Sequence, residues 1–81
     1  MKKVLKFSAT WCGPCKMLAK TLQTVNTDVE IEEVDINQNE ELTAQYRVRG
    51  VPTLVMLEDD VEVKRVVGVK SKEELENWIN N

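Results

Sequence analysis

Two cysteines are the residues of this chain best suited to covalent chemistry. They stand three positions apart in the run Trp11-Cys12-Gly13-Pro14-Cys15. A short apolar stretch with strand character precedes the run, and a helical period begins at its glycine. Cys12 is therefore expected at a helix N-terminus, where free backbone N–H groups and the helix dipole stabilise an anion. This position predicts a lowered thiol pKa, so we interpret Cys12 as a nucleophile.

Cys15 is expected one helical turn further on, within disulfide reach of Cys12. It shares one helix face with Leu18, Leu22 and Val25, because their spacings are 3, 4 and 3. This apolar face predicts that Cys15 is buried and stays protonated longer, as a resolving thiol would. The glycine between the cysteines gives the backbone freedom, and the proline suits a first helical turn.

Three other interpretations of the cysteine pair remain open. They are a structural disulfide, half of a zinc or iron–sulfur site shared across a dimer, and inert core thiols. Metal sites of this kind need four Cys or His ligands, and the chain has two cysteines and no histidine. Cytosolic disulfides are usually redox-active. We therefore predict redox catalysis, with no bound metal and no cofactor.

Length and composition limit the other functions. Eighty-one residues, 42% of them hydrophobic, predict a single domain over residues 1–81. The net charge of −3 disfavours a general nucleic-acid binder. The longest apolar stretch, 51–57, is too short to cross a membrane, and no apolar segment follows Lys2 and Lys3 as in a signal peptide. A cytoplasmic location is therefore expected.

Charge is distributed unevenly along the chain. Residues 1–27 carry five lysines and no acidic residue, whereas residues 28–41 carry seven acidic residues and no basic one. This pattern is typical of solvated surfaces. It is also consistent with a basic environment beside the cysteines, which would favour a thiolate.

Seven elements are predicted from periodicity and breakers. Strands are expected at 4–7, 29–36, 53–57 and 61–67, and helices from 13 to about 25, from 40 to before 50, and from 72 onward. Asn39 is predicted as an N-cap, Ser71 and Glu74 as a capping box, and 58–60 as a hairpin turn. The order β-α-β-α-β-β-α predicts an α/β fold with one four-stranded mixed sheet and helices on both faces.

The strand expected at 29–36 also indicates that both faces of the sheet are covered. Its apolar residues change parity, from Val29 and Ile31 to Val34 and Ile36. Such a change is expected where both faces of a sheet are covered.

The run Trp-Cys-Gly-Pro-Cys-Lys at 11–16 resembles the active-site motif of the thioredoxin family. Three further segments resemble that family in order and spacing, at 35–39, 46–53 and 67–68. The similarity extends over residues 4–80. The family's usual first strand and helix have no counterpart, so the chain resembles a compact form of the thioredoxin-like fold.

The resemblance implies a thiol–disulfide oxidoreductase that reduces protein disulfides. It implies a cis bond before Pro52 and strand-like pairing of a substrate with the backbone of Val51. The implied contact surface consists of Trp11, Gly13, Pro14, Val51, Pro52, Gly68 and Val69. The implied partners are thioredoxin reductase and disulfide-containing proteins such as ribonucleotide reductase, and the implied state is a monomer.

The sequence departs from the family pattern at positions close to the cysteines. Lys6 stands where most members have a buried aspartate, and Glu33 where most have a lysine. We interpret them as an inverted ion pair, buried or half-buried below Cys15 and with a catalytic role, so that Lys6→Ala would raise the Cys12 pKa and slow resolution. Two exposed side chains are the alternative. Ser8 replaces a common tryptophan and removes part of an apolar wall.

Two alternative functions remain open. A glutaredoxin-like, glutathione-coupled oxidoreductase would suit the short chain. Against it, the residues between the cysteines include no aromatic residue. A non-catalytic thioredoxin-like binding subunit is the second alternative. A double variant, Cys12→Ser with Cys15→Ser, that kept biological function would indicate it.

Overall fold

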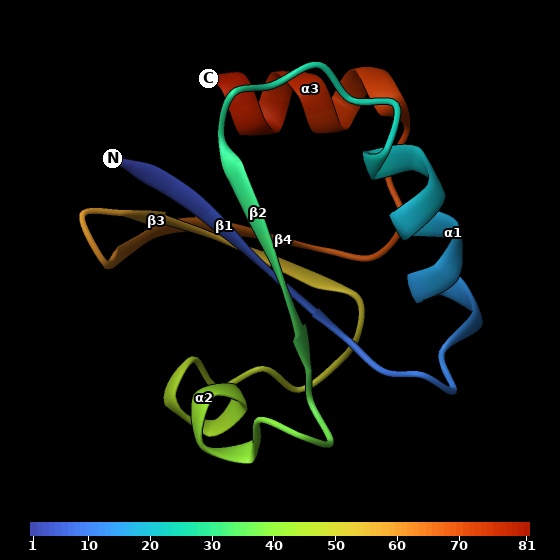
Figure 1. The fold of residues 1–81 in the computed structure, drawn as a ribbon, viewed down its shortest axis with the longest axis vertical. Coiled ribbons are helices and arrows are strands. Elements are labelled where there is room, and N and C mark those ends of the chain that lie inside the picture. Colours follow the sequence, from blue (N-terminus) through green and yellow to red (C-terminus); the bar gives the residue numbers. More distant parts are fainter.

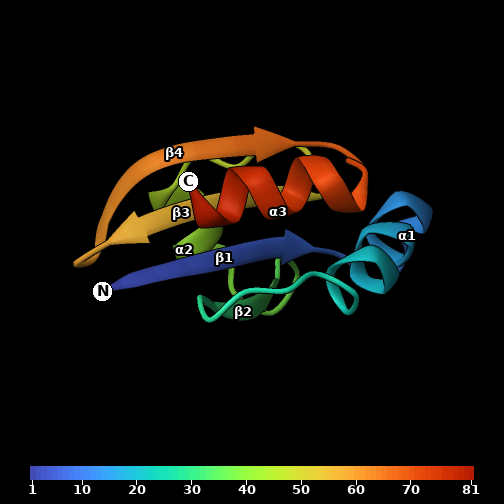
Figure 2. The ribbon, with the colours of Figure 1, turned by 90° about the horizontal axis from the view of Figure 1, so that it is seen from above.

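The chain forms a four-stranded sheet between two layers of helices (Figures 1 and 2). The computed structural model describes all of residues 1–81. Its elements in chain order are β1 (Lys2–Ser8), α1 (Gly13–Leu22), β2 (Glu30–Asp35), α2 (Glu40–Gln45), β3 (Thr53–Glu58), β4 (Val61–Val67) and α3 (Lys72–Asn80). The predicted element order and α/β architecture are confirmed.

The sheet is mixed, with the spatial order β2-β1-β3-β4. β1 runs parallel to β2, since a helix connects them, and β3 runs antiparallel to both of its neighbours. α1 and α3 cover one face of the sheet and α2 covers the other (Figure 2). No helix combines the length and apolar character needed to span a membrane.

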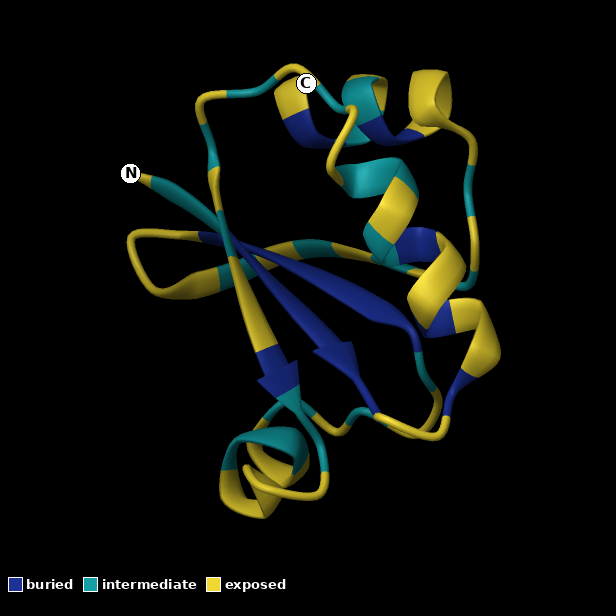
Figure 3. Ribbon diagram, turned by 45° about the vertical axis from the view of Figure 1, so that its right-hand side comes forward, coloured by how far each residue is buried: buried dark blue, intermediate teal, exposed yellow.

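The side chains of β1 alternate between two apolar clusters, as the period of a strand requires. Val4 belongs to the cluster under α1 and α3, which contains Leu18, Leu54, Met56, Leu75 and Ile79. Leu5 and Phe7 belong to the cluster under α2. The central strands β1 and β3 are accordingly almost wholly buried (Figure 3).

The predicted change of faces along β2 is confirmed. Val29 and Ile31 pack against the cluster under α1 and α3, whereas Val34 and Ile36 pack against the cluster under α2. Coverage of this strand is nevertheless thin, because β2 is an edge strand whose glutamates are exposed.

The first helix is shorter than the prediction. α1 ends at Leu22, so Val25 lies beyond it, although Val25 still packs against the core. The hydroxyl and the N–H of Thr24 both donate to the carbonyl of Thr21, which the N–H of Val25 would use in a longer helix, and that N–H donates to Leu22 instead. Such local hydrogen bonds compete with helix propagation, and they explain the early end.

α2 is also shorter than expected, and its cap differs from the prediction. The helix ends at Gln45, and Arg47 adopts a left-handed conformation with φ 53°, a stop signal usually given by glycine or asparagine. Asn39 occupies the N-cap position, but its side chain forms no cap hydrogen bond. Its amide instead donates to the carbonyl of Asp35.

The hairpin and the last helix follow the sequence closely. Asp59 and Asp60 form the turn with φ 50° and 69°, as a type I′ turn requires, so Glu58 belongs to β3. The capping box of Ser71 and Glu74 is present in full. Its hydrogen bonds hold the Glu74 carboxylate at the helix N-terminus, and they keep the pKa of Glu74 below its usual value.

Candidate active site

Cys12 and Cys15 form a disulfide across the first turn of α1. Their Cα atoms are 5.3 Å apart, and the backbone N–H of Cys15 donates to Cys12 Sγ at 3.2 Å. Cys12 is the N-cap residue and Pro14 lies in the first turn. The predicted location of Cys12 and the predicted burial of Cys15 are therefore confirmed.

The burial of Cys12 does not follow from the sequence pattern. Both cysteines pack with Ala9 in a small cluster, against which Ile36 and Val51 also lie. Cys12 Sγ is 3.9 Å from the carbonyl oxygen of Val51. The disulfide is therefore enclosed by loops that follow β1 and β2 and by the loop that precedes β3.

The loop before β3 contains a cis peptide bond between Val51 and Pro52, as the resemblance implied. The N–H of Gly68 donates to the carbonyl of Pro52 at 2.9 Å, which brings the segments 51–52 and 68–69 side by side. Gly68 has φ 92°, a conformation that glycine adopts without strain. Pro52 was expected in the contact surface, but its side chain is buried.

Several residues of the predicted contact surface are open to solvent. Trp11 is 68% exposed and Val69 is also exposed, although both are apolar. Gly13 and Pro14 are exposed, and Val51 is half-buried. Exposed apolar side chains around a buried sulfur pair are consistent with contact to another molecule.

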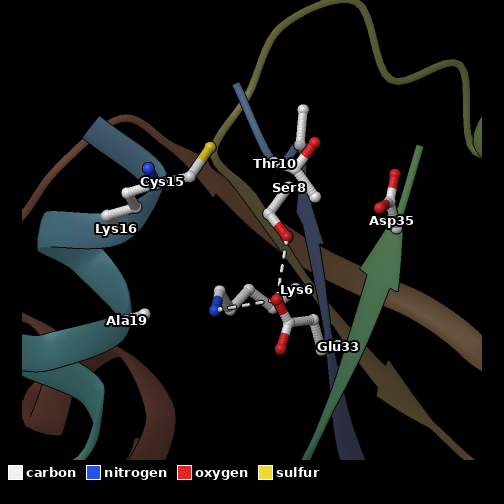
Figure 4. Close-up of a pocket in the computed structure, with 9 residues that line it drawn as sticks. Lys6, Ser8, Thr10, Cys15, Lys16, Ala19, Glu33 and Asp35 are labelled. Atoms are coloured by element: carbon white, nitrogen blue, oxygen red, sulfur yellow. Dashed lines mark hydrogen bonds and ion pairs between the residues drawn. The ribbon is translucent and has the colours of Figure 1, made fainter. Parts of the chain in front are cut away.

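A cavity of about 280 Å³ lies beside Cys15 (Figure 4). Six of the nine residues that line it are charged or carry a hydroxyl, although much of the lining surface is formed by apolar atoms. The charged and hydroxyl side chains that line it are Lys6, Ser8, Thr10, Lys16, Glu33 and Asp35. A cavity of this size, with several polar side chains in its wall, accommodates several water molecules.

The predicted pair of Lys6 and Glu33 is present, but it is not buried as a whole. Lys6 Nζ lies 3.6 Å from Glu33 Oε1, and their side chains are 8% and 69% exposed. The register of the parallel strands explains the contact, because Lys6 and Glu33 are direct partners. The pair is therefore half-buried, which lies within the expectation, and the alternative of two exposed side chains is wrong for Lys6.

Ser8 is a member of this site that the sequence analysis did not assign to it. Its hydroxyl donates to Glu33 Oε1 at 3.3 Å. The sequence signal was the alternation of β1, which places Lys6 and Ser8 on the same face of the sheet. No group of three or more potential metal ligands gathers in the structure.

A disulfide that closes the first turn of a helix, with a cavity beside one cysteine and exposed apolar residues nearby, is suited to dithiol–disulfide exchange. Comparison with known proteins agrees with this class. The Thioredoxin family model matches residues 1–81. Thioredoxin of Chlamydia pneumoniae is 41% identical over an alignment of 80 residues that covers 95% of this chain and 78% of the relative. Thioredoxin of Mycobacterium tuberculosis is 40% identical over an alignment of 73 residues that covers 85% of this chain and 63% of the relative.

Solved structures show the same similarity in three dimensions. A mutant thioredoxin from Halobacterium salinarum superposes with a TM-score of 0.91 at 38% identity, covering 98% of this chain and 72% of the other. Fasciola hepatica thioredoxin gives 0.87 at 36% identity, covering 98% and 78%. The chain belongs to the thioredoxin family. It is a thiol–disulfide oxidoreductase that acts through the Cys12–Cys15 pair.

Proposed function

We propose that this chain is a protein-disulfide reductase and that Cys12 is its nucleophile. The observation that carries the proposal is the position of Cys12 Sγ at the N-terminus of α1, where it accepts the N–H of Cys15. The same N–H and the helix dipole stabilise a thiolate at that sulfur in the reduced protein. Exposed apolar residues next to it suit a folded protein as the substrate better than a small polar one.

The exchange proceeds in two balanced steps. The Cys12 thiolate attacks one sulfur of the substrate disulfide, a mixed disulfide forms, and the first substrate sulfur leaves as a thiolate. Cys15 loses its proton and attacks Cys12 Sγ. The bond between Cys12 and the substrate breaks, the Cys12–Cys15 bond forms, and the second substrate sulfur leaves with the electron pair. Two protein thiols are oxidised, and one substrate disulfide is reduced.

Lys6 and Glu33 act on the second step in this proposal. They border the same cavity as Cys15, and the Lys6 ammonium is held in a largely buried position. A buried positive charge favours the thiolate form of a nearby thiol, and cavity water can carry the released proton outward.

The contact surface and partners complete the proposal. Trp11, Val51 and Val69 offer apolar contact, and the backbone of Val51 pairs with an extended substrate segment. Gly13 and Gly68 permit close approach, while Pro14 and Pro52 shape the surface. A thioredoxin reductase regenerates the dithiol, and disulfide-containing proteins such as ribonucleotide reductase are substrates. Residues 1–81 act as one domain, monomeric and cytoplasmic.

Reduction of a protein disulfide tests the proposal. Insulin reduction, driven by dithiothreitol and followed by turbidity, is expected to be accelerated by the chain and to be lost in Cys12→Ser. Cys15→Ser is expected to trap insulin as a mixed disulfide on Cys12, detected by mass. Activity with glutathione and a small disulfide, but none with insulin, would instead indicate the glutaredoxin-like function.

A further inference from the structure

Glu33 is held in place by two contacts, although most of its side chain is exposed. Ser8 Oγ donates to Glu33 Oε1 at 3.3 Å, and Lys6 Nζ lies 3.6 Å from the same oxygen (Figure 4). These are the only polar contacts of the Glu33 carboxylate in the structure. An exposed ion pair at this distance is weak on its own, since water screens it and side-chain entropy opposes it. The serine hydroxyl is therefore a substantial part of what orders this carboxylate.

Strand geometry places the three groups together beside Cys15. Lys6 and Ser8 are two residues apart on β1, so their side chains share one face of the sheet, and Glu33 is the partner of Lys6 on parallel β2. Cys15 and Ala19 of α1 line the same cavity as these side chains. Figure 4 shows the Lys6 side chain extending toward α1 below Cys15.

We propose that Ser8 is a positioning residue that holds Glu33 against Lys6 and thereby sets the pH at which Cys15 completes the exchange. This inference rests on the proposed function of Lys6 and Glu33. The buried Lys6 ammonium favours the Cys15 thiolate, and a carboxylate fixed beside the ammonium cancels part of its field. A carboxylate released into water cancels less of it.

Ser8 makes no hydrogen-bond contact with the other charged side chains that line the cavity around Cys15. The cavity receives Lys6 from β1, Lys16 from α1, and Glu33 and Asp35 from β2, and none of the remaining elements lines it. An Asp35 oxygen accepts the backbone N–H of Asn37 at 2.8 Å, which holds that carboxylate independently. Removal of the Ser8 hydroxyl therefore acts through Glu33.

The two exchange steps can be observed separately with 5,5′-dithiobis(2-nitrobenzoic acid). Attack by Cys12 on this disulfide releases one coloured thiolate, and attack by Cys15 on the mixed disulfide releases the second. The rate of the second release rises with pH as Cys15 loses its proton. Ser8→Ala is expected to lower the pH at which this rate is half-maximal by roughly a few tenths of a pH unit. The shift is small because the Glu33 carboxylate that moves away is already partly solvated.

Matched variants separate positioning from a general loss of structure. Ser8→Thr keeps a hydroxyl and is expected to behave like the original chain. Thr10→Ala removes another hydroxyl of the cavity wall, one that makes no contact with Glu33, and is expected to leave the midpoint unchanged. Circular-dichroism melts of each variant establish that it is folded under the conditions of the assay.

A double-mutant cycle gives the decisive comparison. Glu33→Gln alone is expected to lower the midpoint at least as far as Ser8→Ala does. In the Glu33→Gln background, Ser8→Ala is expected to have no further effect, because the charge it positions is gone. An unchanged midpoint in Ser8→Ala, or an undiminished shift in the Glu33→Gln background, would overturn the proposal. If the original chain released no coloured thiolate in the first step, the proposed function itself would be contradicted.

Discussion

Leu18 is the main apolar anchor of the helix that carries both cysteines. It is fully buried, and the only other buried residue of α1 is Cys15. Leu18 packs in the cluster beneath α1 and α3 with Leu54, Leu75 and their neighbours. Leu18→Ala is therefore expected to destabilise the fold and to loosen the support of the disulfide.

The size of this effect follows from the burial. The substitution removes three carbon atoms, worth about 0.8 kcal/mol each in transfer free energy, or about 2.4 kcal/mol together. The cavity left behind raises the loss to roughly 3–4 kcal/mol. An 81-residue chain has a free energy of unfolding of about 4–12 kcal/mol. The loss is thus a large part of the total stability, equivalent to a fall in Tm of about 15 °C or more.

Urea denaturation of the oxidised protein measures this loss directly. Met17→Ala is the matched control, because Met17 is the preceding residue on the same helix and is 61% exposed. Its free energy of unfolding is expected to change by no more than about 0.5 kcal/mol. A loss below about 1 kcal/mol for Leu18→Ala, or equal losses for both variants, would refute the assigned role of Leu18.

Three further expectations concern a cap, an ion pair and the contact surface. Ser71→Ala removes the acceptor for the N–H of Glu74 and is expected to lower the free energy of unfolding by about 1 kcal/mol, measured in urea. Hydrogen bonds from Arg65 hold the pKa of Glu62 below its usual value, so the pair stabilises the fold above the unfolded pKa of glutamate. That contribution is lost as the pH falls through the lower folded pKa, so the destabilisation caused by Glu62→Gln at pH 7 is expected to vanish in acid. Trp11→Ala is expected to raise KM for insulin by roughly five- to thirty-fold, with little effect on a small aromatic disulfide.

The elements of the fold were largely predictable because their signals are local. The capping box at Ser71 and the parity change along β2 each mark one structural feature, and both are found. The ends of α1 and α2 were not predictable in the same way. The end of α1 depends on the Thr24 hydroxyl, which donates to a carbonyl of the last turn, and the end of α2 depends on Arg47, which adopts a conformation more typical of glycine.

The site was predictable to the extent that sequence spacing determines proximity. The location of Cys12 at a helix N-terminus follows from the helical period that begins directly after it. The burial of Cys12 depends on Val51, which is far away in the chain, and no local pattern indicates it. The asymmetry of the Lys6–Glu33 pair arises because β2 is an edge strand, and edge positions depend on the topology of the whole sheet.

The equilibrium reduction potential of the Cys12–Cys15 couple tests the central claim most directly. Titration in dithiothreitol buffers, with thiols trapped and counted by mass, is expected to give a reversible two-electron transition. Its midpoint is expected at about −270 mV, the reference value for thioredoxin. A midpoint below about −300 mV, or reduction only on unfolding, would mark a structural disulfide and contradict the account.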